Sequence, residues 1–86
     1  MEVAVFDTYV VKKNGETMHF DIVVPKDQTH EKVLRYGLEY LKSMGQEGRP
    51  LTTKECRFCH REKASEEVKG IINKNGYYIY EMEGCN

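Results

Sequence analysis

The dipeptide Asn14-Gly15 constrains the fold of this chain more than any other feature, because it separates two stretches typical of β-strands. Residues 3–11 and 17–24 are rich in β-branched and aromatic side chains, which favour strands. Asn-Gly is the pair most favoured in a two-residue type I′ turn. The sequence therefore predicts an N-terminal β-hairpin.

A two-residue loop also fixes which residues of the hairpin face each other. The expected partners are Lys13 with Glu16, Val11 with Met18, Tyr9 with Phe20, Asp7 with Ile22 and Val5 with Val24. One face is then almost wholly apolar, and Asp7 is the exception on it, where a lone carboxylate is costly unless it accepts several hydrogen bonds. We expect Asp7 to accept backbone N–H groups of a loop or helix start, with a catalytic role as the alternative.

The opposite face of the predicted hairpin carries Thr8, His19 and Asp21, with Thr8 opposite Asp21. An imidazole near a carboxylate can act as a general base or bind a metal, and it can equally form a hydrogen-bonded pair on a solvated strand. With Asp7, these three residues are the candidate ligand-binding residues.

The next segment indicates a helix. Thr29 is the expected N-cap, apolar residues including Leu38 and Leu41 recur at helical spacing, and Gly45 ends the pattern. Gly37, in the middle of this helix, suggests that a strand approaches it closely.

A second helix and a last strand follow. Ser65 is the expected N-cap, Asn75-Gly76 the stop, and residues 77–82 the closing strand, with a short strand or turn around the preceding cysteines. The order β-β-α-β-α-β predicts an α+β fold of two layers, with both helices on one face of a mainly antiparallel sheet. A chain of 86 residues cannot support two cores, so we expect one domain over residues 1–86.

The three cysteines lie in two short stretches, and with the adjacent histidine they form what we call the cysteine cluster: Cys56, Cys59, His60 and Cys85. Cys56-x-x-Cys59 is half of a zinc-site signature, which Cys85 and a histidine, His60 or His19, could complete. Residues three apart on a strand point to opposite faces, so the two thiols share an ion only if a turn lies between them.

Two other interpretations of the cysteine cluster stay open. Small buried thiols that fill the core are the plainer one. Thiol-redox chemistry is the other, and it would need Cys56 at a helix N-terminus, a placement that the capping-box pattern of Thr52 and Glu55 would permit.

Composition limits the partners and the compartment. Lys and Arg total 13 against 14 Asp and Glu, so the chain lacks the positive field that nucleic-acid binding requires. Its apolar runs are too short to span a membrane, and its first residues lack the basic start of a signal peptide, so we expect a cytoplasmic protein without structural disulfides. Tyr36, Tyr40 and Tyr78 leave a homodimer open.

Four segments together resemble the DUF2024 family, small bacterial proteins described only as a domain of unknown function. The segments are Asp7-Thr8-Tyr9-Val10, His19-Phe20-Asp21, Glu55-Cys56-Arg57-Phe58-Cys59-His60 and residues 76–86 with the ending Glu83-Gly84-Cys85-Asn86. The resemblance spans essentially the whole chain and implies a compact α+β fold. It implies no activity, substrate or cofactor.

Three functional hypotheses follow. The first is a non-enzymatic module that binds a small molecule or a protein partner at the surface around Thr8, His19 and Asp21, with no cofactor. The second is a zinc-binding or thiol-redox protein that uses the cysteine cluster. The third is an enzyme in which Asp7, His19 and Asp21 have acid-base roles.

Overall fold

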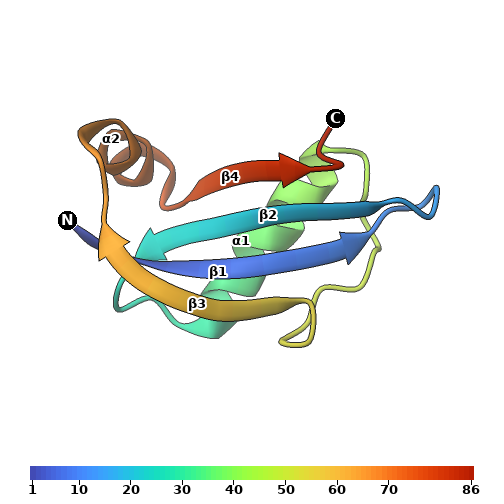
Figure 1. The fold of residues 1–86 in the computed structure, drawn as a ribbon, viewed down its shortest axis with the longest axis horizontal. Coiled ribbons are helices and arrows are strands. Elements are labelled where there is room, and N and C mark those ends of the chain that lie inside the picture. Colours follow the sequence, from blue (N-terminus) through green and yellow to red (C-terminus); the bar gives the residue numbers. More distant parts are fainter.

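The computed structural model describes residues 1–86, which form one four-stranded antiparallel sheet and two helices. In chain order the elements are β1 (Glu2–Val11), β2 (Thr17–Pro25), α1 (His30–Ser43), β3 (Cys56–Lys63), α2 (Glu66–Asn75) and β4 (Tyr78–Glu83). The strand order is β3-β1-β2-β4, so the hairpin β1–β2 is central and β3 and β4 are the edges (Figure 1). The predicted α+β fold and its order of elements are confirmed.

The hairpin turn differs from the predicted one. The N–H of Lys12 donates to the carbonyl of Glu16 at 2.7 Å, and the N–H of Gly15 donates to the carbonyl of Lys12 at 2.9 Å. Gly15 has a φ of 91°, whereas no non-glycine residue has a positive φ, so the turn is not type I′. It is a three-residue loop over residues 13–15, in which Asn14 Oδ1 accepts a hydrogen bond from the N–H of Glu16 at 3.0 Å.

The longer loop shifts the strand register by one residue. Asp7 pairs with Asp21 and Thr8 with Phe20, so the predicted pairs of Asp7 with Ile22 and of Thr8 with Asp21 are wrong. Side chains alternate between the faces of a strand, and a shift of one residue therefore exchanges the expected neighbours. Asp7 joins Asp21 on one face, and Thr8 lies on the other.

The face of β1 and β2 that carries Thr8 packs against α1 and forms the main core. Its buried residues are Ala4, Phe6, Val10, Met18, Phe20, Ile22, Val24, Val33, Tyr40, Leu41, Leu51 and Cys56. Thr8 is fully buried beside them, and its hydroxyl donates to the carbonyl of Phe6 at 3.2 Å. Thr8 is therefore a core residue, which removes it from the candidate ligand-binding surface.

Helix α1 begins as predicted, because Thr29 Oγ1 accepts a hydrogen bond from the backbone N–H of Lys32 at 3.2 Å. Gly37 faces the sheet so closely that a Cβ there would touch side chains of β2 and of the connector after the helix. Leu41 is buried, but Leu38 is 46% exposed, so its predicted place in the buried stripe is wrong. The buried stripe centres on Gly37, and Leu38 lies at its side.

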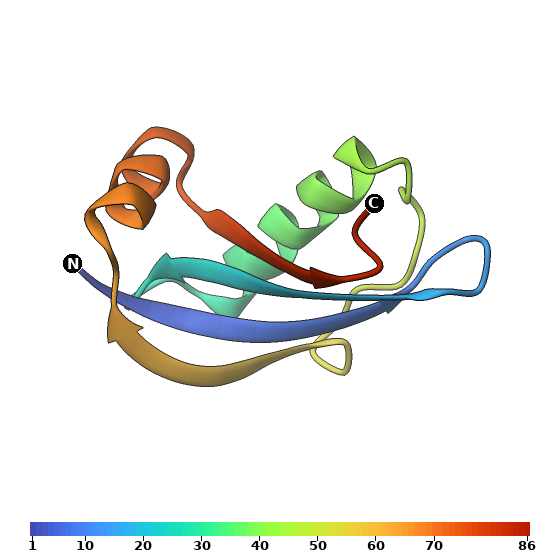
Figure 2. The same cartoon turned by 45° about the horizontal axis from the view of Figure 1, so that its top comes forward.

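Helix α2 packs on the opposite face of the sheet, which corrects the prediction that both helices share one face. Its Ile72 contacts Val3, Val5 and Val23, the apolar side chains that alternate with the main core. The predicted caps are confirmed: Ser65 accepts from the N–H of a first-turn residue, and Gly76 ends the helix with a φ of 91°. In the two views α1 runs along the sheet, whereas α2 stands at one end of it (Figures 1 and 2).

Neither helix is long and apolar enough to cross a membrane. Two of the tyrosines considered for a dimer interface pack within the fold. Tyr40 is 8% exposed and donates to Glu81, and Tyr36 stacks on Tyr77 with ring centroids 4.4 Å apart.

Candidate ligand-binding site

Two carboxylates lie directly opposite each other on the sheet face that α1 does not cover. They belong to Asp7 of β1 and Asp21 of β2, which we call the carboxylate pair. His19 lies beside them, with Nε2 2.6 Å from Asp7 Oδ1. One ligating atom from each of the three residues lies within 4.8 Å of the other two. The corrected register thus brings together three of the four predicted ligand-binding residues.

The electrostatics of the carboxylate pair are unfavourable for two anions. Partial burial, followed by the charge of Asp7 and a hydrogen bond with it, raises the pKa of Asp21 from 3.8 to about 6, while His19 and His60 oppose the rise. Like charges directly opposite each other on a sheet are destabilising. Asp21 therefore holds a proton far more readily than an ordinary aspartate.

Neighbouring side chains orient this group without neutralising it. Tyr9 stacks on His19, with ring centroids 4.0 Å apart and an interplanar angle of 11°. Arg57 of β3 is the backbone partner of Asp7, but its guanidinium donates from Nε to the carbonyl of Lys54 at 3.3 Å. No lysine or arginine side chain forms an ion pair with either carboxylate. The negative charge of Asp21 has no partner of fixed positive charge.

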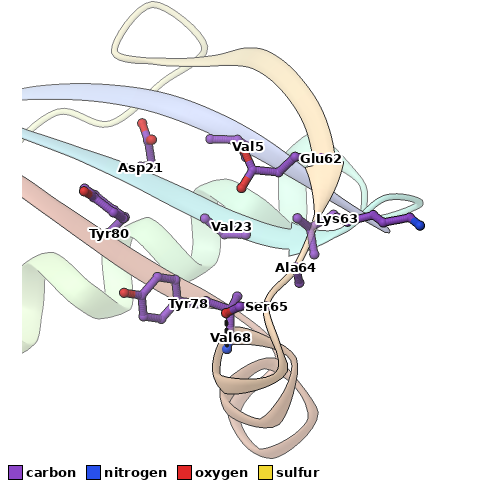
Figure 3. Close-up of a pocket in the computed structure, with 11 residues that line it drawn as sticks. Val5, Asp21, Val23, Glu62, Lys63, Ala64, Ser65, Val68, Tyr78 and Tyr80 are labelled. Atoms are coloured by element: carbon purple, nitrogen blue, oxygen red, sulfur yellow. Dashed lines mark hydrogen bonds between the residues drawn. The ribbon is translucent and has the colours of Figure 1, made fainter. Parts of the chain in front are cut away.

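A cleft of about 360 Å³ opens next to the carboxylate pair, between the sheet and α2. Its apolar surface comes largely from valines of the sheet and of α2. The residues that line the cleft are Val3, Val5, Asp21, Val23, Glu62, Lys63, Ala64, Ser65, Val68, Tyr78 and Tyr80 (Figure 3). This volume lies at the lower end of the range for small-molecule sites, about 300 to 1,000 Å³.

The charges around the cleft are mostly negative. Asp21 and Tyr80 lie at one end, and the Glu62 carboxylate lies near Val5, whereas Lys63 directs its ammonium group away from the cleft (Figure 3). An apolar cavity with a few polar groups is the usual form of a small-molecule site.

The structure does not gather the cysteine cluster into one site. Cys56 is fully buried beside Thr8 in the main core, and burial raises the pKa of its thiol. Cys59 is exposed, and Cys85 lies near the start of β2, with its Sγ 3.6 Å from the carbonyl of His19. Of the ligating side chains, only Asp7, His19 and Asp21 form a close group of three.

His60 lies apart from His19, on β3. Its Nδ1 is 3.2 Å from Cys59 Sγ, and its Nε2 is 2.6 Å from Glu62 Oε1. The cysteine cluster predicted from the sequence includes Cys59 and His60 but not Glu62. Glu62 follows His60 by two positions on a strand, and side chains two positions apart share a face, so the sequence contains a signal for this pair.

Comparison with known proteins supports the fold. A model of the family described as domain of unknown function DUF2024 matches residues 1–82. The chain is also similar to the NMR structure of protein NE1680 from Nitrosomonas europaea, with a TM-score of 0.88 and 48% sequence identity over 100% of both chains. No curated protein matches it. Neither of the two names states an activity or a ligand.

Proposed function

Because the chain belongs to the DUF2024 family, whose description assigns no activity, we propose its function from its own residues: it binds a small organic cation in the cleft beside Asp21. The ligand has an apolar body and an ammonium group. The function is one of binding and includes no chemical step.

The carboxylate pair is the observation that carries this proposal. Asp7 and Asp21 face each other across two strands, and His19 forms its close ion pair with Asp7 and not with Asp21. A ligand ammonium beside Asp21 would relieve the repulsion between the two carboxylates and replace the proton that Asp21 holds below a pH of about 6. Relief of this repulsion would therefore favour binding of the ligand.

The cleft supports an apolar ligand body. Val5, Val23 and Val68 offer apolar surface, and burial of ligand carbon against them contributes about 25 cal/mol per Å². Tyr78 and Tyr80 stand on the same wall, where an aromatic face attracts a nearby cation. An amine with one aromatic ring matches both parts of the site.

The test uses benzylamine, with benzyl alcohol as a neutral analogue of the same shape. We expect benzylamine to shift the backbone amide resonances of Val5, Asp21 and Val23 at pH 7.5 in the presence of a chelator. Benzyl alcohol should bind at least about tenfold more weakly, since the charge-assisted contact to Asp21 is lost. Affinity for benzylamine should rise as pH increases through about 6, because Asp21 must lose its proton.

Asp21→Asn should weaken benzylamine binding at least about tenfold, whereas the matched control Asp27→Asn, an exposed aspartate outside the cleft, should leave it unchanged. Equal affinities for the amine and the alcohol would contradict the proposal. Unchanged binding by Asp21→Asn would contradict it as well.

A divalent metal ion is the competing occupant, since the ligating atoms of Asp7, His19 and Asp21 lie within 4.8 Å of one another. Imidazole and carboxylate ligands suit zinc, and its ligands lie about 2.0 to 2.2 Å from the ion. Calorimetric titration with zinc separates the two cases. Tight zinc binding that His19→Gln removes, together with no benzylamine binding, would replace the organic cation by the metal.

A further inference from the structure

Three reactive side chains of β3 form a second group at the edge of the same sheet face: Cys59, His60 and Glu62. The register of β3 on β1 shifts between Phe58 and His60, which leaves Cys59 as the extra residue of a β-bulge. Bulges re-aim side chains and are frequent next to active sites. Here the bulge places the thiol against the imidazole of the next residue.

The hydrogen bonds of this group define a direction for proton transfer. His60 Nε2 is 2.6 Å from Glu62 Oε1, and an ionised carboxylate only accepts, so Nε2 carries the ring proton. In the neutral imidazole, Nδ1 then has the lone pair, and it accepts from the Cys59 thiol at 3.2 Å. A nucleophile, a base and a carboxylate that orients the base are the parts of an activated thiol.

The thiol is accessible, and no second thiol lies ready to react with it. Cys59 is exposed, and the side chains of His60 and Glu62 are 50% and 54% exposed. Cys56 is fully buried in the α1 core, and Cys85 follows β4 at the other edge of the sheet. A disulfide formed at Cys59 would therefore persist until an external thiol reduced it.

We propose that Cys59 is a nucleophilic thiol that exchanges with low-molecular-weight disulfides and becomes S-thiolated. The Cys59 proton passes to His60 Nδ1, and the thiolate attacks one sulfur of the disulfide. The Sγ–S bond forms while the S–S bond of the reagent breaks. Cys59 is oxidised, and the leaving half is reduced to a thiol after it takes a proton from the imidazolium.

The charges near Cys59 are mixed. Arg57, Arg61 and Lys63 are exposed on β3, but Arg61 and Lys63 alternate with His60 and Glu62 along the strand, and Asp7 lies opposite Arg57. Oxidised glutathione is a low-molecular-weight disulfide of the kind proposed. The proposal does not rest on cation binding in the cleft.

The experiment follows the reduced full-length chain with oxidised glutathione by intact mass spectrometry. We expect one glutathionyl group per chain, and peptide mapping should locate it on Cys59. His60→Gln should slow the reaction about tenfold. Loss of a general base often costs about 10²-fold or more, but His60 and Glu62 are half exposed, so we expect a smaller effect here.

Glu62 acts as a positioning residue, so its variant needs a separate readout. Glu62→Gln should slow the reaction severalfold and change the tautomer of His60, which ring-nitrogen NMR shifts report. Cys85→Ser is the matched control and should leave the rate unchanged. A primary adduct on Cys85, or an unchanged rate for a folded His60→Gln variant, would overturn the proposal.

Discussion

Replacement of Asp21 by asparagine should make the protein more stable at neutral pH. The folded state raises the pKa of Asp21 from 3.8 to about 6, with partial burial as the main cause and the charge of Asp7 as the second. Asparagine has a similar shape and no charge. The variant therefore removes the repulsion within the carboxylate pair while it keeps the size of the side chain.

The magnitude follows from the linkage between proton binding and folding. A pKa rise from 3.8 to about 6 corresponds to about 3 kcal/mol at 1.36 kcal/mol per pKa unit. Asp21 is only partly buried, so screening by water reduces this figure to about 1 kcal/mol. In a domain of this size, such a change raises the melting temperature by about 4 to 8 °C.

The sign of the pH dependence is fixed. Between pH values of about 4 and 6, the folded protein keeps the Asp21 proton that the unfolded chain has lost. Wild-type stability therefore falls as pH rises through this window, and the loss is complete above it. The titratable groups around Asp21 are Asp7, His19 and His60, and they remain in the variant.

Urea unfolding with a chelator present, at several pH values from 4 to 7.5, measures the difference. At pH 7.5, Asp21→Asn should unfold at about 1 M more urea than the wild type, for an m-value of about 1 kcal/mol/M, and this gap should narrow towards pH 4. The control Asp27→Asn should change stability by less than about 0.5 kcal/mol. A destabilised Asp21→Asn protein at pH 7.5, or a gap independent of pH, would refute the reasoning.

Three further predictions concern the fold. Leu41→Ala should lower the free energy of unfolding by about 2 to 5 kcal/mol in urea, whereas Leu38→Ala, at a 46% exposed position, should cost less than about 1 kcal/mol; similar losses would contradict the core assignment. Gly37→Ala should lower the melting temperature because its Cβ meets packed side chains, while Gly70→Ala, whose Cβ meets nothing, should stabilise α2 by about 0.5 to 1 kcal/mol. Thr29→Ala should lower the free energy of unfolding by about 1 kcal/mol and lower the melting temperature as well, and an unchanged melting temperature would exclude a stabilising role for the N-cap.

Strand and helix patterns predicted the order of elements, but the geometry of one turn decided the site. Asn14-Gly15 predicted the hairpin correctly, yet the turn contains one more residue than the favoured Asn-Gly type. The hydrogen bond from the Glu16 N–H to Asn14 Oδ1 supports the longer loop. Local hydrogen bonds of this kind favour the three-residue loop over the two-residue type I′ turn, and residue propensities alone do not distinguish the two turns.

The consequences of that turn explain which site residues were predicted and which were not. His19 and Asp21 were grouped from their spacing on one strand, which does not depend on register. The neighbours of Asp7 and Thr8 depend on how the first strand pairs with the second. The one-residue shift therefore places Asp7, instead of Thr8, on the face of His19 and Asp21. The cysteines form one predicted cluster because Cys56 and Cys59 have the spacing of metal ligands and Cys85 is a further thiol. The bulge separates Cys59 from the buried Cys56, and Cys85 follows β4 at the opposite edge of the sheet.

The face of the sheet that α1 does not cover holds several features that do not favour stability. The carboxylate pair is repulsive, the valine-lined cleft stays open because α2 covers only one end, and Cys59 is an exposed thiol. A domain of this size has only about 5 to 15 kcal/mol of stability in total. Apolar residues in place of Asp7 and Asp21 would bury more surface and remove the repulsion. These costs lie together on one face, whereas the other face forms the main core with α1, and this contrast supports the proposed binding function on the open face.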